Sequence, residues 1–398
     1  MSQIRRHFLA LATNPSRATS SKAHWMLLVA RPARTEDVCS LERIASNVAI
    51  GNTRPDQDRI IKQIELSEQV LSNPSFPPRQ GIIYLVTEMY KAGKPPKIVG
   101  HGKLQYAASA SWQLATRARS HDNNSSVDVP VLRYSSELTE ALEIAGNAVL
   151  PAFRNMKIGK FQTFARVLFA VQHKMPGVKL LFADLLTQRT SPAEATGKKN
   201  LGKPAGNSYR FPFYEQVVRP LLGNVEYDEA DLRRYDDIDT SNGSCAFLNS
   251  HLGSQVLSDG RVESAVELVL HALPPSVLKY LGKVGKDTVG AEKSLRAIGF
   301  RESDKRDILD GGKYMLAELD HLNNTTNCKK KKIQICPDDD DDVERKKVVF
   351  TPSVDRARYS AMAVHGDDRD SHLRVHASVA KLAGLVNGQT VTVMDNGL

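Results

Sequence analysis

The stretch ELTEALEIAGNAVLPAFRNMKIGKFQTFARVLFAVQHKMPGVKLLFADLL, residues 137–186, carries the pattern that decides the fold. Glu137 to Leu150 is apolar enough for a buried strand, and Pro151 to Lys160 is a loop with several basic residues. Phe161 to His173 places apolar residues at helical spacing, and Val178 to Leu186 is a second short apolar strand. Strand, basic loop, helix and strand in this order predict the βαβ unit of an α/β fold.

The residues before this stretch predict further elements of the same fold. An apolar run at Trp25 to Ala30 predicts a strand, and Glu36 to Val48 places apolar residues at helical spacing. Arg59 to Leu71 repeats that spacing and predicts a second amphipathic helix. Gly81 to Tyr90 and Lys97 to Gln105 predict two strands joined by a Gly/Pro loop, as in a hairpin.

The patterns in the rest of the chain are weaker. The polar stretch Ser109 to Val129 predicts no regular element. Phe211 to Leu222 predicts a short aromatic helix, and Val262 to Leu281 predicts a helix apart from its internal Pro-Pro pair. Ala291 to Gly299 predicts a helix closed by glycine, and Asp307 to Leu319 returns to strand character.

Opposite charges gather in two runs near the C-terminal end. Lys329 to Lys332 and Asp338 to Asp342 predict a charged, solvated insertion. Short apolar runs beyond it predict a small β-rich domain. The expected organisation is an extension at 1–24, a first domain at 25–222, a second α/β part at 223–322, the insertion at 323–347 and the β-rich domain at 348–398.

The composition limits the classes of protein that the chain can belong to. With 398 residues, 41% of them hydrophobic, it can bury two or three cores, and no apolar run approaches the roughly 20 residues of a membrane span. The net charge of +9 is either a general surface property or a sign of an anionic partner. No RNA-recognition or zinc-finger motif accompanies the charge, so we expect neither a nucleic-acid nor a membrane partner.

The cysteines and the N-terminus give two further expectations. The four cysteines form no CxxC pair and no metal-ligand rhythm, so no metal site is expected. Residues 1–24 are basic, rich in Ser, Thr and Ala, and lack acidic residues. They predict either a mitochondrial presequence, with the matrix as compartment, or a disordered extension of a cytoplasmic protein.

The loop between the first strand and the helix of the βαβ unit is the candidate binding site. It reads R-N-M-K-I-G-K from Arg154 to Lys160, and backbone N–H groups at a helix N-terminus can bind phosphate without a committed charged side chain. We therefore assign Arg154, Lys157, Gly159 and Lys160 to cofactor binding, together with Ala141 on the preceding strand. The alternative is a basic surface loop that only caps the helix.

Motifs along almost the whole chain, from about Leu27 to Met394, resemble the arginine N-succinyltransferase family. The matching residues are Arg31-Pro32, Asp37, Leu41 and Ala45, then Ser135-Ser136-Glu137-Leu138, Arg154 and Gly159, and finally Gly299-Phe300-Arg301 with Asp307-Ile308-Leu309-Asp310-Gly311-Gly312. The resemblance implies an acyl-CoA N-acyltransferase-like mixed sheet with flanking helices and a small C-terminal β-rich part. It also implies succinyl-CoA as co-substrate, no permanently bound cofactor, and the α-amino group of L-arginine as acceptor.

The resemblance also implies roles for particular residues. Phe213-Tyr214 stands where the acetyltransferase superfamily has a tyrosine that protonates the departing thiolate, although either aromatic ring can equally be a packed core residue. Attack on a thioester needs a neutral amine, and Glu137 and His271 are the candidate bases. Glu137 can alternatively be structural, and His271 a core histidine.

Two positions depart from the family pattern. The proposed catalytic histidine of the family falls on Gly285, and glycine cannot transfer a proton. The first glycine of the acyl-CoA loop is Lys157. The sequence therefore predicts an N-acyltransferase, with a catalytically impaired relative that serves as a regulatory or scaffolding subunit as the alternative. In either case a homo- or hetero-oligomer with a homologous subunit is expected.

Overall fold

A computed structural model of the chain describes residues 26–47, 55–73, 81–91, 94–106, 111–121, 125–135, 138, 140–173, 175–187, 211–221, 267–270, 273–286, 288–308, 310–325, 328–338, 346–351, 359–368 and 371–394. The predicted presequence, Glu137 and His271 lie outside the described residues. Within the described ranges, none of the helices is long and apolar enough to cross a membrane.

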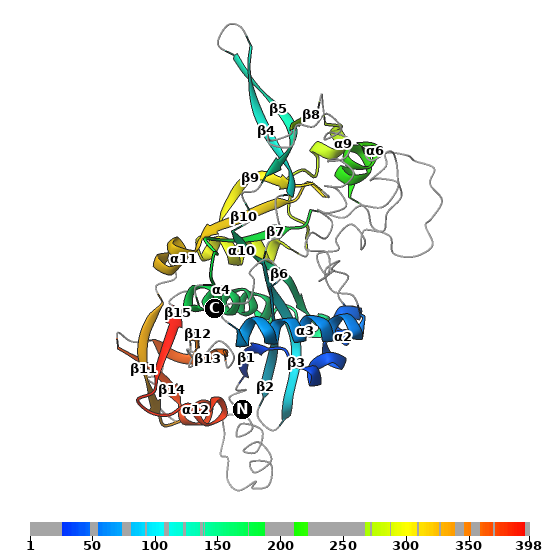
Figure 1. The fold of residues 1–398 in the computed structure, drawn as a ribbon. Coiled ribbons are helices and arrows are strands. Elements are labelled where there is room, and N and C mark those ends of the chain that lie inside the picture. The colour runs from blue at the N-terminus through cyan, green and yellow to red at the C-terminus, as the bar shows by residue number, and fades with distance from the viewer. Residues whose placement is uncertain are drawn as a thin grey trace.

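One mixed sheet runs through the described part of the molecule (Figure 1). Its centre consists of β1 (Met26–Pro32), β2 (Ile82–Lys91), β3 (Lys94–Tyr106) and β6 (Ala141–Val149), each antiparallel to the next. The next strand, β7 (Leu180–Leu185), is parallel to β6 because helix α4 (Ile158–His173) forms the crossover between them. The predicted β2–β3 hairpin and βαβ unit are therefore confirmed.

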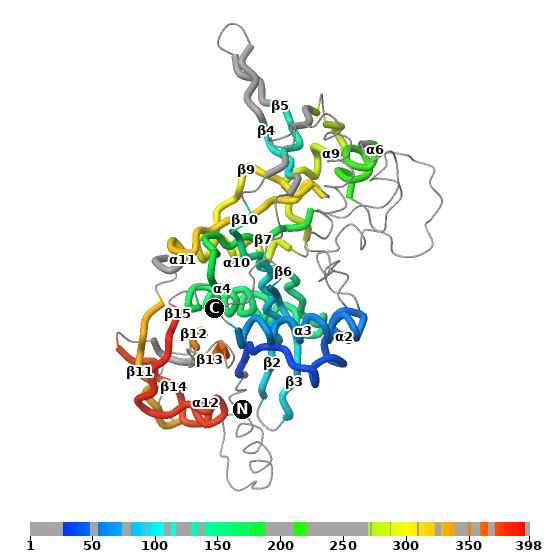
Figure 2. The backbone as a smooth tube through the Cα atoms, viewed as in Figure 1, coloured from blue at the N-terminus to red at the C-terminus, as the bar shows by residue number. Residues whose placement is uncertain are grey.

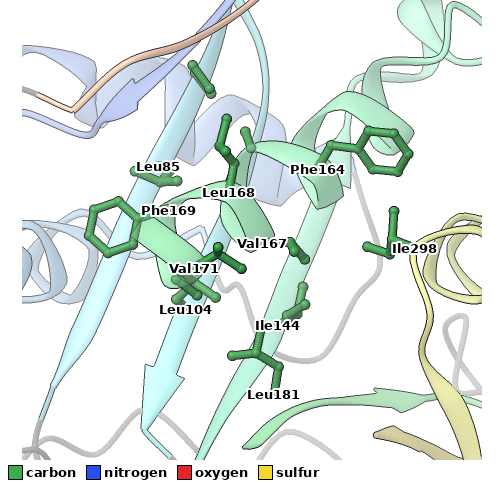
Figure 3. Close-up of a cluster of buried hydrophobic side chains, with 14 of the residues drawn as sticks. Leu85, Leu104, Ile144, Phe164, Val167, Leu168, Phe169, Val171, Leu181 and Ile298 are labelled. Atoms are coloured by element: carbon green, nitrogen blue, oxygen red, sulfur yellow. The ribbon is translucent and has the colours of Figure 1, made fainter. Parts of the chain in front are cut away.

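The alternation of side chains along β2 separates the two faces of this central sheet. Tyr84 and Val86 pack against α2 (Val38–Asn47) and α3 (Gln57–Ser72), the two predicted amphipathic helices. Ile83 and Leu85 belong to the main core, which α4 covers. Figure 3 shows side chains of α4 directed at Leu85, Leu104 and Ile144 of the strands. The central helix is thus buried because its residues are apolar over most of its circumference.

The polar stretch without a predicted element forms a long antiparallel hairpin. It consists of β4 (Ser111–His121) and β5 (Ser125–Ser135), which pair along their whole length. Two further strands, β9 (Arg301–Asp307) and β10 (Lys313–Glu318), connect β4 to β7 within the sheet. Hydrogen bonds between the paired strands stabilise this hairpin. The side-chain pattern of the sequence did not predict it, because such bonds join residues that are distant in the sequence.

The predicted helix over Val262 to Leu281 is wrong in most of its described part. Glu267–Val269 forms strand β8, which pairs with β5, and only Pro275–Leu278 forms the short helix α9. Pro274 and Pro275 explain the division, because proline is tolerated in the first turn of a helix and not in its interior. The neighbouring prediction was right, because α10 (Val289–Ala297) is a helix followed by Gly299 with a positive φ.

The C-terminal strands form a closed ring of five. In ring order they are β12 (Lys346–Thr351), β15 (Thr390–Met394), β11 (Lys329–Cys336), β14 (His372–His376) and β13 (Ala361–Asp368), which pairs back with β12. Helix α12 (Ala377–Ala383) connects β14 to β15. Figure 2 traces these strands in orange and red beside the central sheet, which β13 joins by pairing with β1. The predicted β-rich C-terminal part is confirmed.

The prediction of a solvated charged insertion fails for its lysine run. Lys329 to Lys332 lie on β11, paired with β15, and the side chain of Lys331 is buried. Helix α11 (Leu319–Thr325) also enters the range assigned to the insertion. A strand tolerates consecutive lysines when alternate side chains reach solvent, as those of Lys330 and Lys332 do. The acidic run beyond Asp338 lies outside the described residues.

Candidate functional site

The loop between β6 and α4 has an unusual backbone. After the short 3₁₀ turn Pro151–Phe153, Asn155 and Lys157 adopt φ values of 65° and 60°. Such left-handed conformations are uncommon for residues with a side chain and recur where function constrains the chain. Lys157, at which the sequence resemblance predicts the first glycine of an acyl-CoA loop, thus has the backbone conformation that glycine adopts most readily.

The first turn of α4 offers an electropositive end. Phe161 donates the first helical hydrogen bond, to the carbonyl of Lys157, and no acidic residue lies in this turn. Arg154 and Lys157 are exposed, and the half-buried Lys160 lies 5.2 Å from the Phe164 ring centroid. Burial and the charge of Lys157 lower the pKa of Lys160. The four loop residues predicted to bind a cofactor are thus gathered at one helix end.

Gly159 fixes the distance between α4 and the preceding strand. Its carbonyl accepts hydrogen bonds from Asn147 Nδ2 at 3.4 Å and from Thr163 Oγ1 at 3.1 Å. A Cβ at this position would lie 3.5 Å from Asn147 Nδ2, which is ordinary van der Waals contact. Residue 159 therefore contacts the preceding strand through its carbonyl oxygen, and the absence of a side chain is not required for this contact. Ala141, the fifth residue predicted to bind the cofactor, lies at the start of β6.

Ala141 lies at the opposite end of β6 from the loop. It is buried and packs with Leu138, Phe182 and Tyr314. At about 3.3 Å per residue, the strand places Ala141 roughly 26 Å from Val149, which adjoins the loop. The structure therefore does not bring Ala141 together with the other predicted cofactor-binding residues.

A bulge interrupts β6 close to the loop. His101 pairs with Ala148 and Lys103 pairs with Ala145, so Gly146 and Asn147 together face the single residue Gly102 on β3. Gly146 has a φ of 57°, as a bulge residue in the left-handed region requires. On the other side, β6 pairs with β7 only through residues 141–143. In the described ladder, the two parallel strands therefore separate before the bulge.

Arg166 of α4 donates hydrogen bonds to backbone carbonyls beside this bulge. Arg166 was not among the residues predicted from the sequence. Its Nη1 donates to the carbonyl of Ala145 at 2.7 Å and to that of Lys103 at 3.3 Å, while Nε donates to Gln162 O at 3.0 Å. The side chain is buried, which lowers the pKa of the guanidinium to about 9, whereas Glu143 acts to raise it. A signal was present, because Arg166 is a single charge within an otherwise apolar helical stretch.

A second buried polar group lies on the opposite face of the same strands. His101 is fully buried and stacks edge-on against Tyr84, with ring centroids 5.4 Å apart. Its Nδ1 and Nε2 atoms have no hydrogen-bond partner among the described residues. Burial, followed by the charges of Lys103 and Arg166, lowers the pKa of His101 well below 6.5. The imidazole is therefore neutral at physiological pH.

Tyr214 belongs to a different hydrophobic cluster from the aromatic residue of the loop. It begins a one-turn π-helix (Tyr214–Val218), a rare element that recurs at functional sites. The side chain is buried in a cluster that includes Phe213, Val277 and Ile308. The aromatic Phe153 of the loop packs instead against the main core. Phe213 is a core aromatic residue, as one reading of the sequence expected, and the leaving-group role of Tyr214 stays a prediction.

Gly285, the position at which the sequence resemblance predicts the family's histidine, has no room for a side chain. A Cβ there would lie 2.8 Å from the carbonyl oxygen of Thr187 and 3.3 Å from that of Leu186. Gly285 N also donates to Leu186 O at 2.9 Å, so its backbone is fixed against the end of β7. A side chain at position 285 would therefore displace the backbone at the end of β7.

The D-I-L-D-G-G motif builds the turn that holds Thr187 in place. Asp310 Oδ2 accepts a hydrogen bond from Thr187 N at 2.9 Å, and its Oδ1 accepts one from Gly312 N at 2.6 Å. Tyr314 Oη donates to Asp307 Oδ2 at 3.2 Å. This motif therefore has a structural role. No group of three or more potential metal ligands occurs within the described residues.

Comparison with known proteins agrees with the motifs. The sequence model of a family described as "Arginine N-succinyltransferase beta subunit" matches residues 28–194. An arginine N-succinyltransferase of Yersinia enterocolitica is 20% identical over 373 residues, 92% of this chain and 96% of that protein. The resemblance to the arginine N-succinyltransferase family is therefore confirmed.

The fold comparison covers nearly the whole chain. The structure of arginine/ornithine succinyltransferase subunit AI from Pseudomonas aeruginosa matches with a TM-score of 0.67 and 15% identity, over 94% of this chain and 99% of that chain. At this identity the match establishes the fold alone, and it confirms the predicted mixed α/β architecture.

Proposed function

We propose that this chain, which resembles the arginine N-succinyltransferases along nearly its whole length, is an N-acyltransferase. It moves a succinyl group from succinyl-CoA to the α-amino group of L-arginine. The acyl-CoA binds at the loop between β6 and α4, and the chain works in an oligomer with a homologous subunit.

The observation that carries the proposal is the backbone of that loop. Asn155 and Lys157 hold left-handed conformations directly before a 16-residue helix whose first turn has no acidic residue. Amide groups at such a helix end bind phosphate, and the helix dipole favours negative charge there. The positively charged side chains of Arg154, Lys157 and Lys160 would attract the phosphate groups of the acyl-CoA.

The chemistry needs three further contributions from the chain. A base must take a proton from the acceptor ammonium group, a backbone donor must stabilise the oxyanion, and an acid must protonate the departing thiolate. The separated part of β6 supports the second requirement, because backbone groups beyond residue 143 are not paired with β7. Tyr214 is the proposed acid, and Glu137 or His271 the proposed base.

The packing of Gly285 favours a second candidate function. Since a histidine cannot be placed there without moving the backbone of Thr187, the chain is a non-catalytic relative if Glu137 and His271 do not supply a base. Such a relative would bind acyl-CoA or a homologous subunit and serve as a regulatory or scaffolding subunit.

Calorimetric titration with succinyl-CoA, followed by a thiol-release assay with L-arginine, separates these functions. Binding with thiol release supports the transferase. Binding without release supports the non-catalytic relative, and absence of binding refutes the acyl-CoA site. A matched pair of variants tests the loop: Arg154→Ala should weaken binding, whereas Lys157→Gly, which restores the glycine-compatible backbone and removes one charge, should weaken it less.

A further inference from the structure

The β6 bulge owes its shape to one side chain outside the strand. A bulge leaves the backbone groups of the extra residue without their ladder partners. At this bulge the carbonyl oxygens of Ala145 on β6 and Lys103 on β3 both accept from Nη1 of Arg166, at 2.7 Å and 3.3 Å. The guanidinium therefore ties together the two strands at the point where their regular pairing is interrupted.

We propose that Arg166 is a positioning residue for acyl transfer, because it fixes the bulge that directs the free edge of β6 toward the thioester. This inference rests on the proposed acyltransferase function. Arg166 itself does not touch the substrate. It acts through the backbone of Ala145 and the residues that follow it on β6.

The choice of arginine follows from the geometry. Its Nε is held by the carbonyl of Gln162 at 3.0 Å, which leaves the planar end of the guanidinium to reach two carbonyls on different strands. A lysine ammonium at the same position lacks this rigid fork and cannot keep all three hydrogen bonds. Burial of a guanidinium is costly, and the hydrogen bonds from Nε and Nη1 to three carbonyl oxygens offset part of that cost.

Gly102 on β3 provides the space that the Arg166 guanidinium occupies. A Cβ on Gly102 would lie 2.9 Å from Cζ and 3.0 Å from Nε of Arg166, so only glycine leaves room for the guanidinium. The backbone of Gly102 is not in the left-handed region, so alanine is compatible with its conformation. An alanine there would collide with the movable end of the arginine side chain. It would displace the guanidinium without a direct change to the strand.

The bulge matters in the reaction because of where charge develops. The neutral amine of the acceptor attacks the thioester carbonyl and forms the new C–N bond, and the nitrogen loses one proton to a base. The C–S bond breaks, its electron pair leaves with sulfur as the thiolate, and the thiolate takes up a proton. Negative charge develops on the thioester carbonyl oxygen during the attack. A backbone N–H group stabilises this charge only when the N–H group is closely aligned with the oxygen. Misplacement by about 1 Å can lower the rate by about a hundredfold.

The test compares wild type with Arg166→Lys, Gly102→Ala and the double variant. We expect both single variants to lower kcat by about a hundredfold while the Kd for succinyl-CoA stays unchanged, since the loop is untouched. The double variant should be no worse than Arg166→Lys alone, because both changes remove the same contact. Gly290→Ala, with nothing within 4 Å of the added Cβ, is the matched control and should leave kcat unchanged.

Amide hydrogen exchange provides a readout that does not depend on activity. In Arg166→Lys, exchange should rise for residues 145–149 of β6 and 101–103 of β3, with no change in β14. Unchanged exchange, or a rise spread over the whole sheet, would overturn the positioning role, as would a parallel loss of kcat and succinyl-CoA binding. If wild type binds succinyl-CoA without thiol release, the proposed function fails and the positioning role in acyl transfer fails with it; the exchange pattern then separately decides whether Arg166 holds the bulge.

Discussion

His101→Leu removes a buried imidazole that the fold keeps neutral. Both ring nitrogens are buried without a hydrogen-bond partner among the described residues, and the side chain is fully inaccessible. Leucine has a similar volume and no polar atom. At pH 8 we expect the variant to be more stable than wild type by about 1 kcal/mol, since an unpaired buried polar group costs about 1–3 kcal/mol and the contact with Tyr84 is lost.

The pH dependence gives the larger effect. Because the folded-state pKa of His101 lies well below the unfolded value of 6.5, the unfolded chain binds a proton that the folded chain does not. This contribution to stability is complete above pH 6.5 and is lost as the pH falls through that value toward the folded pKa. Well below pH 6.5, the slope of this loss is at most about 1.4 kcal/mol per pH unit, the value for one bound proton.

Urea unfolding of wild type and His101→Leu at pH 8.0, 6.5 and 5.0 measures this difference. The free energies of unfolding of the two proteins should differ more at pH 5.0 than at pH 6.5, with the variant gaining relative to wild type as the pH falls. His372→Gln is the control, because His372 is exposed on β14, and it should follow wild type. Parallel curves for wild type and His101→Leu would refute the assignment of His101 as a neutral, unpartnered group.

Three further substitutions test the packing around the site by chemical denaturation and thiol release. Gly285→His should destabilise the fold by about 1–3 kcal/mol through its clash with Thr187, without a gain in activity; a gain would show that the segment can move. Asp310→Ala should cost about 2–4 kcal/mol because two buried amides lose their acceptor, and a neutral result would contradict the turn described above. Arg31→Met should cost about 3–5 kcal/mol, since it leaves the buried Glu88 carboxylate unpaired; Arg31→Lys should recover part of it.

The sequence predicted the elements whose apolar residues follow one period. The strand at 141–149 and the helix at 158–173 were predicted correctly because the apolar residues that form their core contacts lie close together in the sequence. The β4–β5 hairpin and β11 were missed because polar strands are held by pairing with distant segments. The strand Glu267–Val269 was predicted as helix for a different reason, because a short apolar run fits the periods of both a helix and a strand.

The candidate site divides along similar lines. The loop residues Arg154 to Lys160 were found because a helix start and basic residues are visible in the sequence. Arg166 and His101 were missed because their roles depend on a bulge, which no periodicity announces. The alternation Gly100-His101-Gly102-Lys103 within a strand could have marked them, because glycine in a strand indicates a bulge or a close approach.

The shared strand β13 has a consequence for biosynthesis. Its residues 361–363 pair with Leu28 to Ala30, so during translation β1 waits for a partner that is synthesised about 330 residues later. At about 5–20 residues per second, this wait lasts roughly 20 to 60 seconds. During that time the apolar edge of β1 is open to unwanted pairing. The nascent chain should therefore depend on chaperones more than its final architecture suggests, and its yield should respond to translation rate.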